Sequence, residues 1–318
     1  QEVAKENGVR PSQPLTSAVI ASQIACTASP ISAATAAMFV VVEKMNVSFA
    51  QVLLVIITTS AFAAIVCAII SSFQGKDLAD DPIYQERLAK GLVSLQSKEE
   101  KARPATKKAK LSVAIFLAGV CVIVSLLLFK KQIGHTLGSR DIIVMVMMFC
   151  AWVMYLFCDV ELSTIKDAPI FRSGFESLIV VLGIVWFSST IINAHIPEVK
   201  ESAIALLKQY PYLLAVVFFL ASAVLFSQGS TAALIVPVAA SLGVDAATIC
   251  GSFVACSALY ITNVYPTTAF AISCDDSGSF MGPRWNGSFV INHPFFIPGC
   301  VSLAVAVPFG LMLAKAVM

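Results

Sequence analysis

The sequence predicts an all-α, polytopic membrane protein. Three observations support this fold class: long uncharged apolar runs, prolines in the middle of two of them, and a weak internal repeat. Of the 318 residues, 58% are hydrophobic and only 13% are charged, and the mean hydropathy is +0.85. Soluble domains carry about a quarter charged residues, so the composition excludes an ordinary cytosolic enzyme. The net charge of +2 gives no sign of a nucleic-acid partner.

Asp, Glu, Lys and Arg are absent from eight stretches of 17–36 residues, which together make up about two thirds of the chain. A helix of about 20 apolar residues crosses the hydrocarbon core of a bilayer. We therefore expect membrane-embedded helices at about 14–42, 47–73, 111–129, 141–158, 173–194, 211–241 (in two pieces), 246–272 and 294–317.

The one long polar segment, 74–110, holds nine of the 21 basic residues, so the positive-inside rule puts it in the cytoplasm. Tyr84, Leu88, Leu92 and Leu95 follow helical spacing, which is typical of an amphipathic helix. A solvated linker is the alternative.

The spans counted from this loop put the segment 195–210 and the C-terminus in the periplasm. Asp275 and Asp276 are expected to be solvated turn residues. The predicted organisation has three parts: 1–73, the remainder of a first inverted repeat; 74–110, a cytoplasmic charged loop; and 111–318, a second inverted repeat.

The run 211–241 is too long for one simple span, and the small and polar residues SQGST at 227–231 interrupt it. Such residues are costly at membrane depth unless they line a cavity. We therefore expect a re-entrant hairpin with Gly229 in its turn, in which Ser230 or Thr231 caps the returning helix.

Proline interrupts two further helices, at TASPIS (27–32) and TNVYPTT (262–268). A proline ends the helix before it and suits the first position of the next one. We expect Pro30 and Pro266 to begin new half-helices, with Ser29 as the N-cap of the first. Each break should leave a partly positive helix end near the middle of the membrane.

The two proline breaks lie in related segments. Gly-Val pairs that begin at Gly8 and Gly243 are each followed by a helix rich in small residues and then by Pro30 or Pro266. The predicted topology sends these segments in opposite directions, so the repeats are inverted. Inverted repeats with discontinuous helices are typical of secondary transporters. A first-repeat hairpin would fall before residue 1, so we expect the chain to lack the start of that repeat.

The apolar runs around the breaks contain no Lys or Arg, so hydroxyls, amides and half-helix N-termini are left to bind a substrate. Helix N-termini favour anions such as carboxylates. We predict a site for a small dicarboxylate anion, with Na⁺ or H⁺ as a candidate coupling ion and no other cofactor. The candidate substrate-binding residues are Ser29, Pro30, Ser32, Ser227, Gln228, Ser230, Thr231, Asn263, Pro266, Thr267 and Thr268. No catalytic residue is predicted, and the nine cysteines form no CxxC pair that would indicate a metal site.

Several segments resemble the anaerobic C4-dicarboxylate transporters of the Dcu family (A/B type). They are EVAKENGVRP and SAVIASQIACTASPISA near the N-terminus, DDPIYQERLAKGLVSL in the charged loop, and SGS with FVINHPFFIPG near the C-terminus. The resemblance covers essentially the whole chain, which corresponds to roughly the last three quarters of a family member. It implies transport of fumarate, malate, succinate and aspartate across the bacterial inner membrane, by uptake or antiport, with elevator-like motion and a periplasmic C-terminus. The turn SQGST and the segment GPRWNGS depart from the family pattern and leave the preferred dicarboxylate open.

Other classes remain as alternatives. A Na⁺- or H⁺-coupled carrier of another carboxylate or an amino acid fits the same fold, and competition assays would separate it. An intramembrane enzyme needs an aspartate pair, an HExxH motif or a Ser–His pair at membrane depth, and the sequence contains none. A channel fits broken inverted repeats less well. The expected partners are dicarboxylate anions and membrane lipid; a homodimer is left open.

Overall fold

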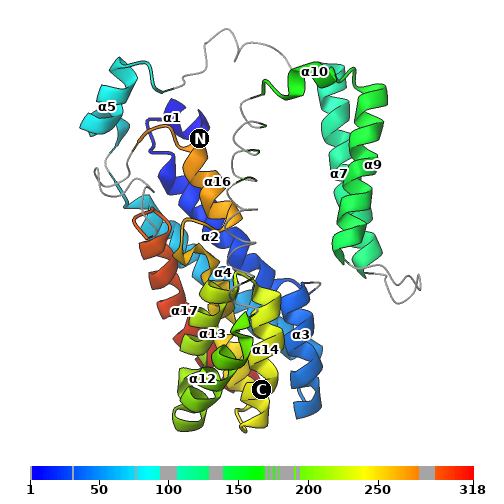
Figure 1. Ribbon diagram of the computed structural model, residues 1–318, viewed down its shortest axis with the longest axis vertical. Coiled ribbons are helices and arrows are strands. Elements are labelled where there is room, and N and C mark those ends of the chain that lie inside the picture. Colours follow the sequence, from blue (N-terminus) through cyan, green and yellow to red (C-terminus); the bar gives the residue numbers. More distant parts are fainter. Residues whose placement is uncertain are drawn as a thin grey trace. The chain divides into compact units, whose positions relative to one another are not determined.

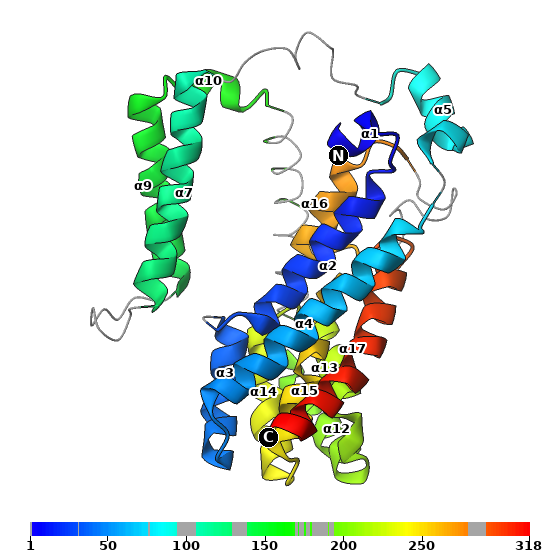
Figure 2. The same ribbon diagram turned by 180° about the vertical axis from the view of Figure 1, so that it is seen from behind.

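The computed structural model describes residues 2–30, 32–75, 77–93, 106–128, 139–168, 194–278 and 291–318, together with Phe171, Phe175, Ile179 and Thr190. Every regular element in these ranges is a helix (Figures 1 and 2). The α-helices are α1 (Glu2–Glu6), α2 (Ser12–Ala28), α3 (Ala33–Val42), α4 (Phe49–Ser72), α5 (Pro82–Ala89), α7 (Lys107–Leu128), α9 (Ser139–Phe157), α10 (Leu162–Ile165), α12 (Ile196–Gln209), α13 (Leu214–Leu225), α14 (Gln228–Ser241), α15 (Ala246–Ser252), α16 (Pro266–Cys274) and α17 (Phe296–Val317). The 3-10 helices are η1 (Glu43–Met45), η2 (Leu78–Asp80), η3 (Pro211–Leu213) and η4 (Phe253–Ile261).

Most of the predicted helices are present with ends close to those expected. The predicted helix at 173–194 lies almost entirely outside the described residues. Helix α12 lies in the segment 195–210, which has no long uncharged run and was therefore not predicted to be helical.

The chain divides into two compact units, Gln1–Leu95 with Ser173–Met318 and Gln96–Arg172. In the second unit α7 and α9 lie side by side. Gly119 of α7 allows this approach, because a Cβ atom there would clash with the Sγ atom of Cys150 on α9. An ion pair between Lys108 and Asp159 joins the start of α7 to the residues after α9.

In the first unit α4 packs between α2 and α17. A capping box begins α4: Ser48 Oγ accepts from Gln51 N at 3.3 Å, and the Gln51 side chain accepts from Ser48 N at 3.0 Å. Helix α17 crosses α15 at two glycines, where a Cβ atom on Gly310 would lie 2.5 Å from the Gly251 carbonyl oxygen. The absence of side chains lets the two helices cross backbone to backbone.

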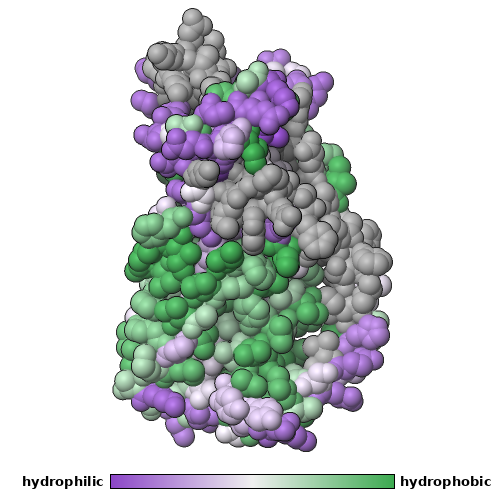
Figure 3. Space-filling view, turned by 90° about the vertical axis from the view of Figure 1, so that its left-hand side faces the viewer, coloured by the Kyte–Doolittle hydropathy of each residue, from purple (hydrophilic) through white to green (hydrophobic). Residues whose placement is uncertain are grey.

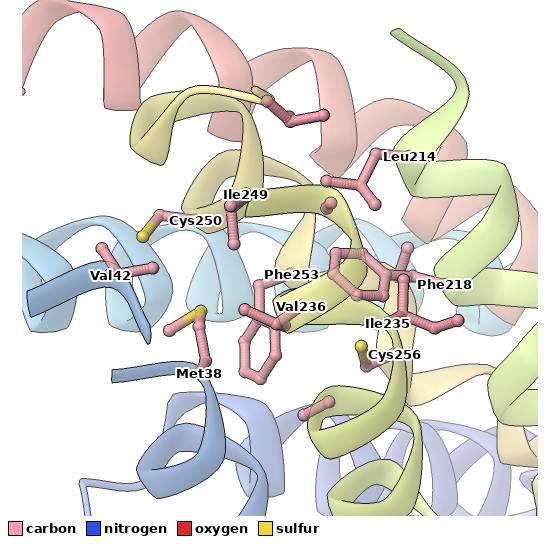
Figure 4. Close-up of a cluster of buried hydrophobic side chains, with 14 of the residues drawn as sticks. Met38, Val42, Leu214, Phe218, Ile235, Val236, Ile249, Cys250, Phe253 and Cys256 are labelled. Carbon is pink, nitrogen blue, oxygen red and sulfur yellow. The ribbon is translucent and has the colours of Figure 1, made fainter. Parts of the chain in front are cut away.

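The main core of this unit joins both helices of the α13–α14 turn to α3 and η4, which each flank one of the proline breaks (Figure 4). Met38 from α3, Phe218 from α13, Ile235 from α14 and Phe253 from η4 are all fully buried there. The rings of Phe218 and Phe253 meet edge to face with their centroids 6.0 Å apart. The broken helices therefore pack on one another and not only on continuous spans.

The surface of the helices is apolar, as a lipid-facing surface should be. Figure 3 shows apolar side chains covering the middle of one face and hydrophilic residues gathered at its two ends. Large apolar side chains are exposed on α4 and α17: Leu54, Ile57, Ile65, Ile69, Val301, Val305 and Met312. Among the described residues, Ser12–Met45, Phe49–Ser72 and Phe296–Val317 are long and apolar enough to cross a bilayer, and Ala246–Ile261 with Pro266–Cys274, bent by 50°, makes a fourth candidate.

Helix α5 confirms a helix in the charged loop, but it is shorter than the apolar spacing predicts. Tyr84 is buried, and Leu88 packs against it. Leu92 is 55% exposed, because α5 ends two residues before Gly91, which turns the chain with a φ of 68°. Leu95 lies outside the described residues.

Charged side chains join α1, α5 and the end of α16. Lys5 Nζ lies 3.2 Å from both carboxylate oxygens of Asp276, and Arg87 Nε donates to the Asp276 carbonyl at 3.0 Å. Arg10 and Asp81 form an ion pair in which both side chains are buried. Asp276 lies in a turn, as expected. It is not fully solvated, because its side chain pairs with Lys5 from a distant segment and is 22% exposed.

Candidate functional site

The first break separates α2 from α3, and Ser32 is the N-cap of α3. The backbones of Ser29 and Ser32 are extended, and Ser32 Oγ accepts a hydrogen bond from Thr35 N at 3.1 Å. The predicted cap at Ser29, with Pro30 beginning the next helix, is therefore wrong. The hydroxyl of Ser32 is the one aimed at an unpaired N–H group, so α3 starts after it. Thr35 Oγ1 donates to the Thr27 carbonyl at 3.3 Å and ties the two half-helices together.

The second break is the turn between α13 and α14, which pack against each other. Phe226 takes the left-handed conformation with a φ of 49°, and Ser227 caps α14 by accepting from Ser230 N at 3.1 Å. The predictions of Gly229 in the turn and of a cap at Ser230 or Thr231 are wrong, because the chain turns earlier and these residues form the first turn of α14. A left-handed non-glycine residue costs ~1–2 kcal/mol, so the surrounding packing holds this turn.

The third break lies between η4 and α16, and Pro266 is the first residue of α16, as predicted. Thr262 is extended, and Asn263 lies within the break. Thr268 Oγ1 donates to the carbonyls of Tyr265, at 2.6 Å, and Thr262, at 3.1 Å. These two bonds fold the segment between the helices onto the first turn of α16.

Gln23, in α2, joins the second and third breaks. Its Nε2 atom donates to Thr267 Oγ1 of α16 at 2.9 Å, and its backbone carbonyl accepts from Gln228 Nε2 of α14 at 2.6 Å. Gly229 lies against α3, since a Cβ atom there would be 3.4 Å from Ala33 Cβ. The beginnings of α3, α14 and α16 therefore meet beside the second half of α2. Gln23 was not among the predicted site residues; its only sequence signal is an amide in the middle of an apolar run.

The helix beginnings also face one another. Helix α3 continues onward from α2, and α14 begins beside α3 and packs along it. Helix α16 runs the other way, back along α2 from Gln23 towards α1, where Asp276 meets Lys5 (Figures 1 and 2). The partly positive ends of two helices thus point towards that of a third.

The predicted site residues differ in how far they are exposed. The buried ones are Gln228, Thr231 and Thr268; the half-buried ones are Ser29, Ser32, Ser227, Asn263 and Pro266; the exposed ones are Pro30, Ser230 and Thr267. The hydroxyls of Thr231 and Thr268 donate to backbone carbonyls, at 2.7 Å to Ser227 and at 2.6 Å to Tyr265, so these two side chains shape the breaks.

The region is uncharged. The segments 11–42, 209–244 and 246–274, which contain the three breaks, carry no Asp, Glu, Lys or Arg. Among the described residues, no three His, Cys, Asp or Glu side chains come together as a metal site would require. Hydroxyls, amides and helix N-termini are the groups that this region offers to a ligand.

An apolar cavity of about 320 Å³ lies elsewhere in the same unit, between α12, α13 and α14. It is lined by Glu198, Ser202, Ala203, Leu206, Val217, Leu220, Ala221, Val224 and Ile235. None of these residues belongs to a break. Ser202 offers one hydroxyl, but the other lining groups are apolar side chains and the Glu198 carboxylate, which repels an anion. The cavity is therefore a poorer candidate for an anion site than the breaks are.

Comparison with known proteins assigns the whole chain to one family. A sequence profile described as "Anaerobic c4-dicarboxylate membrane transporter" matches residues 1–318. The chain is 39% identical to the C4-dicarboxylate transporter DcuA of Wolinella succinogenes over 319 residues, which cover 98% of this chain and 72% of the relative. It is 38% identical to DcuA of Escherichia coli K12, over 99% of this chain and 72% of that protein, and 30% identical to the anaerobic C4-dicarboxylate transporter DcuB of Escherichia coli O6:H1, over 98% and 72%. No solved structure matches the chain.

Proposed function

The chain belongs to the anaerobic C4-dicarboxylate transporter family, and from this premise we propose that it is a secondary transporter of the bacterial inner membrane that carries fumarate, malate, succinate and aspartate by uptake or antiport. The observation that carries the proposal is the meeting of three helix N-termini beside Gln23 in a region without charged residues. Such a meeting point attracts an anion through backbone N–H groups and helix dipoles.

The arrangement of the ends suits two carboxylates. Helices α3 and α14 begin side by side, and α16 begins opposite them. One carboxylate would lie at the paired ends, near the hydroxyls of Ser32 and Ser227. The other would lie at the start of α16, near Thr267. A C4-dicarboxylate spans both positions with its apolar carbons in the middle.

The architecture that accompanies this function is part of the proposal. Helices α13 and α14 have 12 and 14 residues and are ~18 and ~21 Å long at 1.5 Å per residue. Each is shorter than the bilayer core of ~30 Å, which supports a re-entrant hairpin. We propose that the segments α2–α3 and α15–α16 are the broken elements of two inverted repeats. The segment 74–110 is then cytoplasmic, and the C-terminus is periplasmic.

Counterflow tests the transport function. The full-length protein, reconstituted into vesicles loaded with unlabelled succinate, should take up labelled fumarate or aspartate against its gradient. Absence of dicarboxylate flux in a folded, full-length sample would remove the proposal. Flux that depends on a Na⁺ or pH gradient would identify the coupling ion.

Glycine variants test the position of the site. Ser32→Gly and Ser227→Gly remove the hydroxyls but keep most of the capping energy, because glycine is a tolerable N-cap. Each should raise the KM for succinate several-fold with the protein still folded. Ser241→Ala is the control, because this hydroxyl donates to the Val238 carbonyl at the far end of α14. An unchanged KM in both glycine variants would show that the substrate site is not at the starts of α3 and α14.

A further inference from the structure

Gln23 is a destabilising residue at its buried position in α2. It is 3% exposed, and its Oε1 atom is buried without a hydrogen-bond partner among the described residues. A buried amide with an unmet acceptor lowers stability, whereas an apolar side chain of the same length would not. Packing alone therefore does not explain a glutamine in the middle of α2.

The side-chain bond of Gln23 explains it better, because it reaches Thr267, 244 residues away. The backbone carbonyl of the same residue accepts from Gln228, 205 residues away; any residue would supply that carbonyl, but only the amide joins it to Thr267. Thr267 is the second residue of α16, and Gln228 is the first residue of α14. Gln23 thus holds the beginnings of two helices that face each other, and so sets the separation between them.

That separation matters for a ligand with a negative group at each end. One additional methylene lengthens a dicarboxylate by about one C–C bond, ~1.5 Å. Hydrogen bonds between N–H and oxygen lose most of their strength over a smaller change than this. If the two anion positions are held at a fixed spacing, one chain length fits and its neighbours do not.

We propose that Gln23 is a positioning residue that sets the chain-length selectivity of the transporter, by fixing the distance between the starts of α14 and α16. This inference rests on the proposed function, because it takes the two ends as the positions of the two carboxylates. Gln23 acts through Thr267 and Gln228, and its own contact with substrate is not required.

The test compares three dicarboxylates that differ by one methylene: malonate, succinate and glutarate. Their KM values are measured in vesicles that contain full-length protein. Gln23→Met keeps the length of the side chain and loses its bond to Thr267. In this variant the KM ratios of glutarate to succinate and of malonate to succinate should fall by about fivefold, the effect of losing one neutral hydrogen bond. A residue with a merely structural role would raise all three KM values together and leave the ratios unchanged.

The matched control is Gln13→Met on the same helix. Gln13 Nε2 also makes one long-range bond, to the Gln74 carbonyl at 2.8 Å, but it lies away from the breaks. Its ratios should stay at the wild-type values. Unchanged ratios in Gln23→Met, or equal changes in both variants, would overturn the inference.

A second pair of variants decides the matter if Gln23→Met does not reach the membrane. Thr267→Ser keeps the hydroxyl that Gln23 holds and Thr267→Val lacks it, so the two KM ratios should fall more in Thr267→Val than in Thr267→Ser. Equal ratios in the two variants would contradict the proposal. If the wild-type protein carries succinate and Gln23→Met has the same KM ratios, this inference alone is removed. If the wild-type protein carries none of the three dianions, the proposed function and the inference are removed together.

Discussion

The ion pair between Arg10 and Asp81 gives a prediction whose size follows from burial. The Arg10 side chain is 0% exposed and that of Asp81 is 8% exposed. Asp81 has a second task, since its Oδ1 atom accepts from Ile83 N at 2.8 Å and Tyr84 N at 3.2 Å and so caps α5. Asp81→Asn keeps an oxygen for the cap and removes only the charge, so it isolates the ion pair.

The expected loss in free energy of unfolding is large because the buried Arg10 side chain stays positively charged. Burial lowers the pKa of the Arg10 guanidinium, and the charge of Asp275 opposes that shift, but arginine starts so high that it stays protonated at neutral pH. Removal of one partner from a buried pair costs about 3–5 kcal/mol when the other charge is left uncompensated. Asp275 still compensates part of the Arg10 charge, so Asp81→Asn should cost about 3 kcal/mol, the lower end of this range. Asp81→Ala should cost about 1 kcal/mol more, because the N-cap of α5 is lost too.

The assay is equilibrium unfolding of the purified protein in mild detergent, in four forms: wild type, Asp81→Asn, Asp81→Ala, and the double variant Arg10→Met with Asp81→Asn. The double variant should recover most of the stability that Asp81→Asn loses, because an apolar side chain replaces the buried cation of Arg10. Equal stability of wild type and Asp81→Asn would refute the reasoning, as would a double variant less stable than Asp81→Asn.

Three further outcomes are expected. Gly310→Ala places a Cβ atom 2.5 Å from the Gly251 carbonyl oxygen; such overpacking costs about 1–3 kcal/mol, and an unchanged unfolding midpoint would contradict it. Ser227→Ala should destabilise by about 1 kcal/mol and Ser227→Gly by only a few tenths, so equal midpoints would argue against the observed cap. Burial raises the pKa of the Asp245 carboxyl, but hydrogen bonds from the side chain and backbone of Thr248 outweigh it and hold the pKa below its ordinary value. The stabilisation is therefore complete above about pH 3.9 and is lost as the pH falls through the lower pKa of the folded state. Asp245→Asn should flatten the acid limb of the unfolding midpoint against pH, and an identical limb would refute this assignment.

The sequence was sufficient to predict where the helices break, but not which residue caps each one. Proline removes a backbone donor, but Pro237 and Pro308 lie inside the unbroken helices α14 and α17. The breaks near Pro30 and Pro266 were predictable because small and polar residues accompany these two prolines. An N-cap depends instead on where the chain after it becomes helical. Ser29 and Ser32 carry the same side chain and both have extended backbones, but a helix follows directly only after Ser32.

The same reasoning explains why the hairpin turn was misplaced by a few residues. Gly229 is the residue that turns most easily, but the chain turns at Phe226. Gly229 lies inside α14 instead, where a Cβ atom would be 3.4 Å from Ala33 Cβ of α3, an ordinary contact distance. A glycine inside a helix and a glycine that permits a turn look identical in the sequence.

Gln23 shows a different limit. Its partners lie more than 200 residues away, and no local pattern in α2 distinguishes it from Gln13, which meets a backbone carbonyl outside the candidate site. Both are glutamines in one helix. Only the packing of α14 and α16 against α2 gives one of them a place in the candidate site.

A site built from helix ends binds with limited strength, and this suits a carrier. Each end contributes about 0.3–2 kcal/mol, so three contribute ~1–6 kcal/mol, and 4.1 kcal/mol corresponds to a Kd of about 1 mM. A buried lysine or arginine would hold a dianion more firmly, but an empty site would then carry an uncompensated charge within the membrane. Without such a charge, discrimination among dianions has to come from the spacing of the ends. In this fold the spacing is held by neutral hydrogen bonds between α2, α14 and α16, which makes Gln23 more important for selectivity than its single side chain suggests.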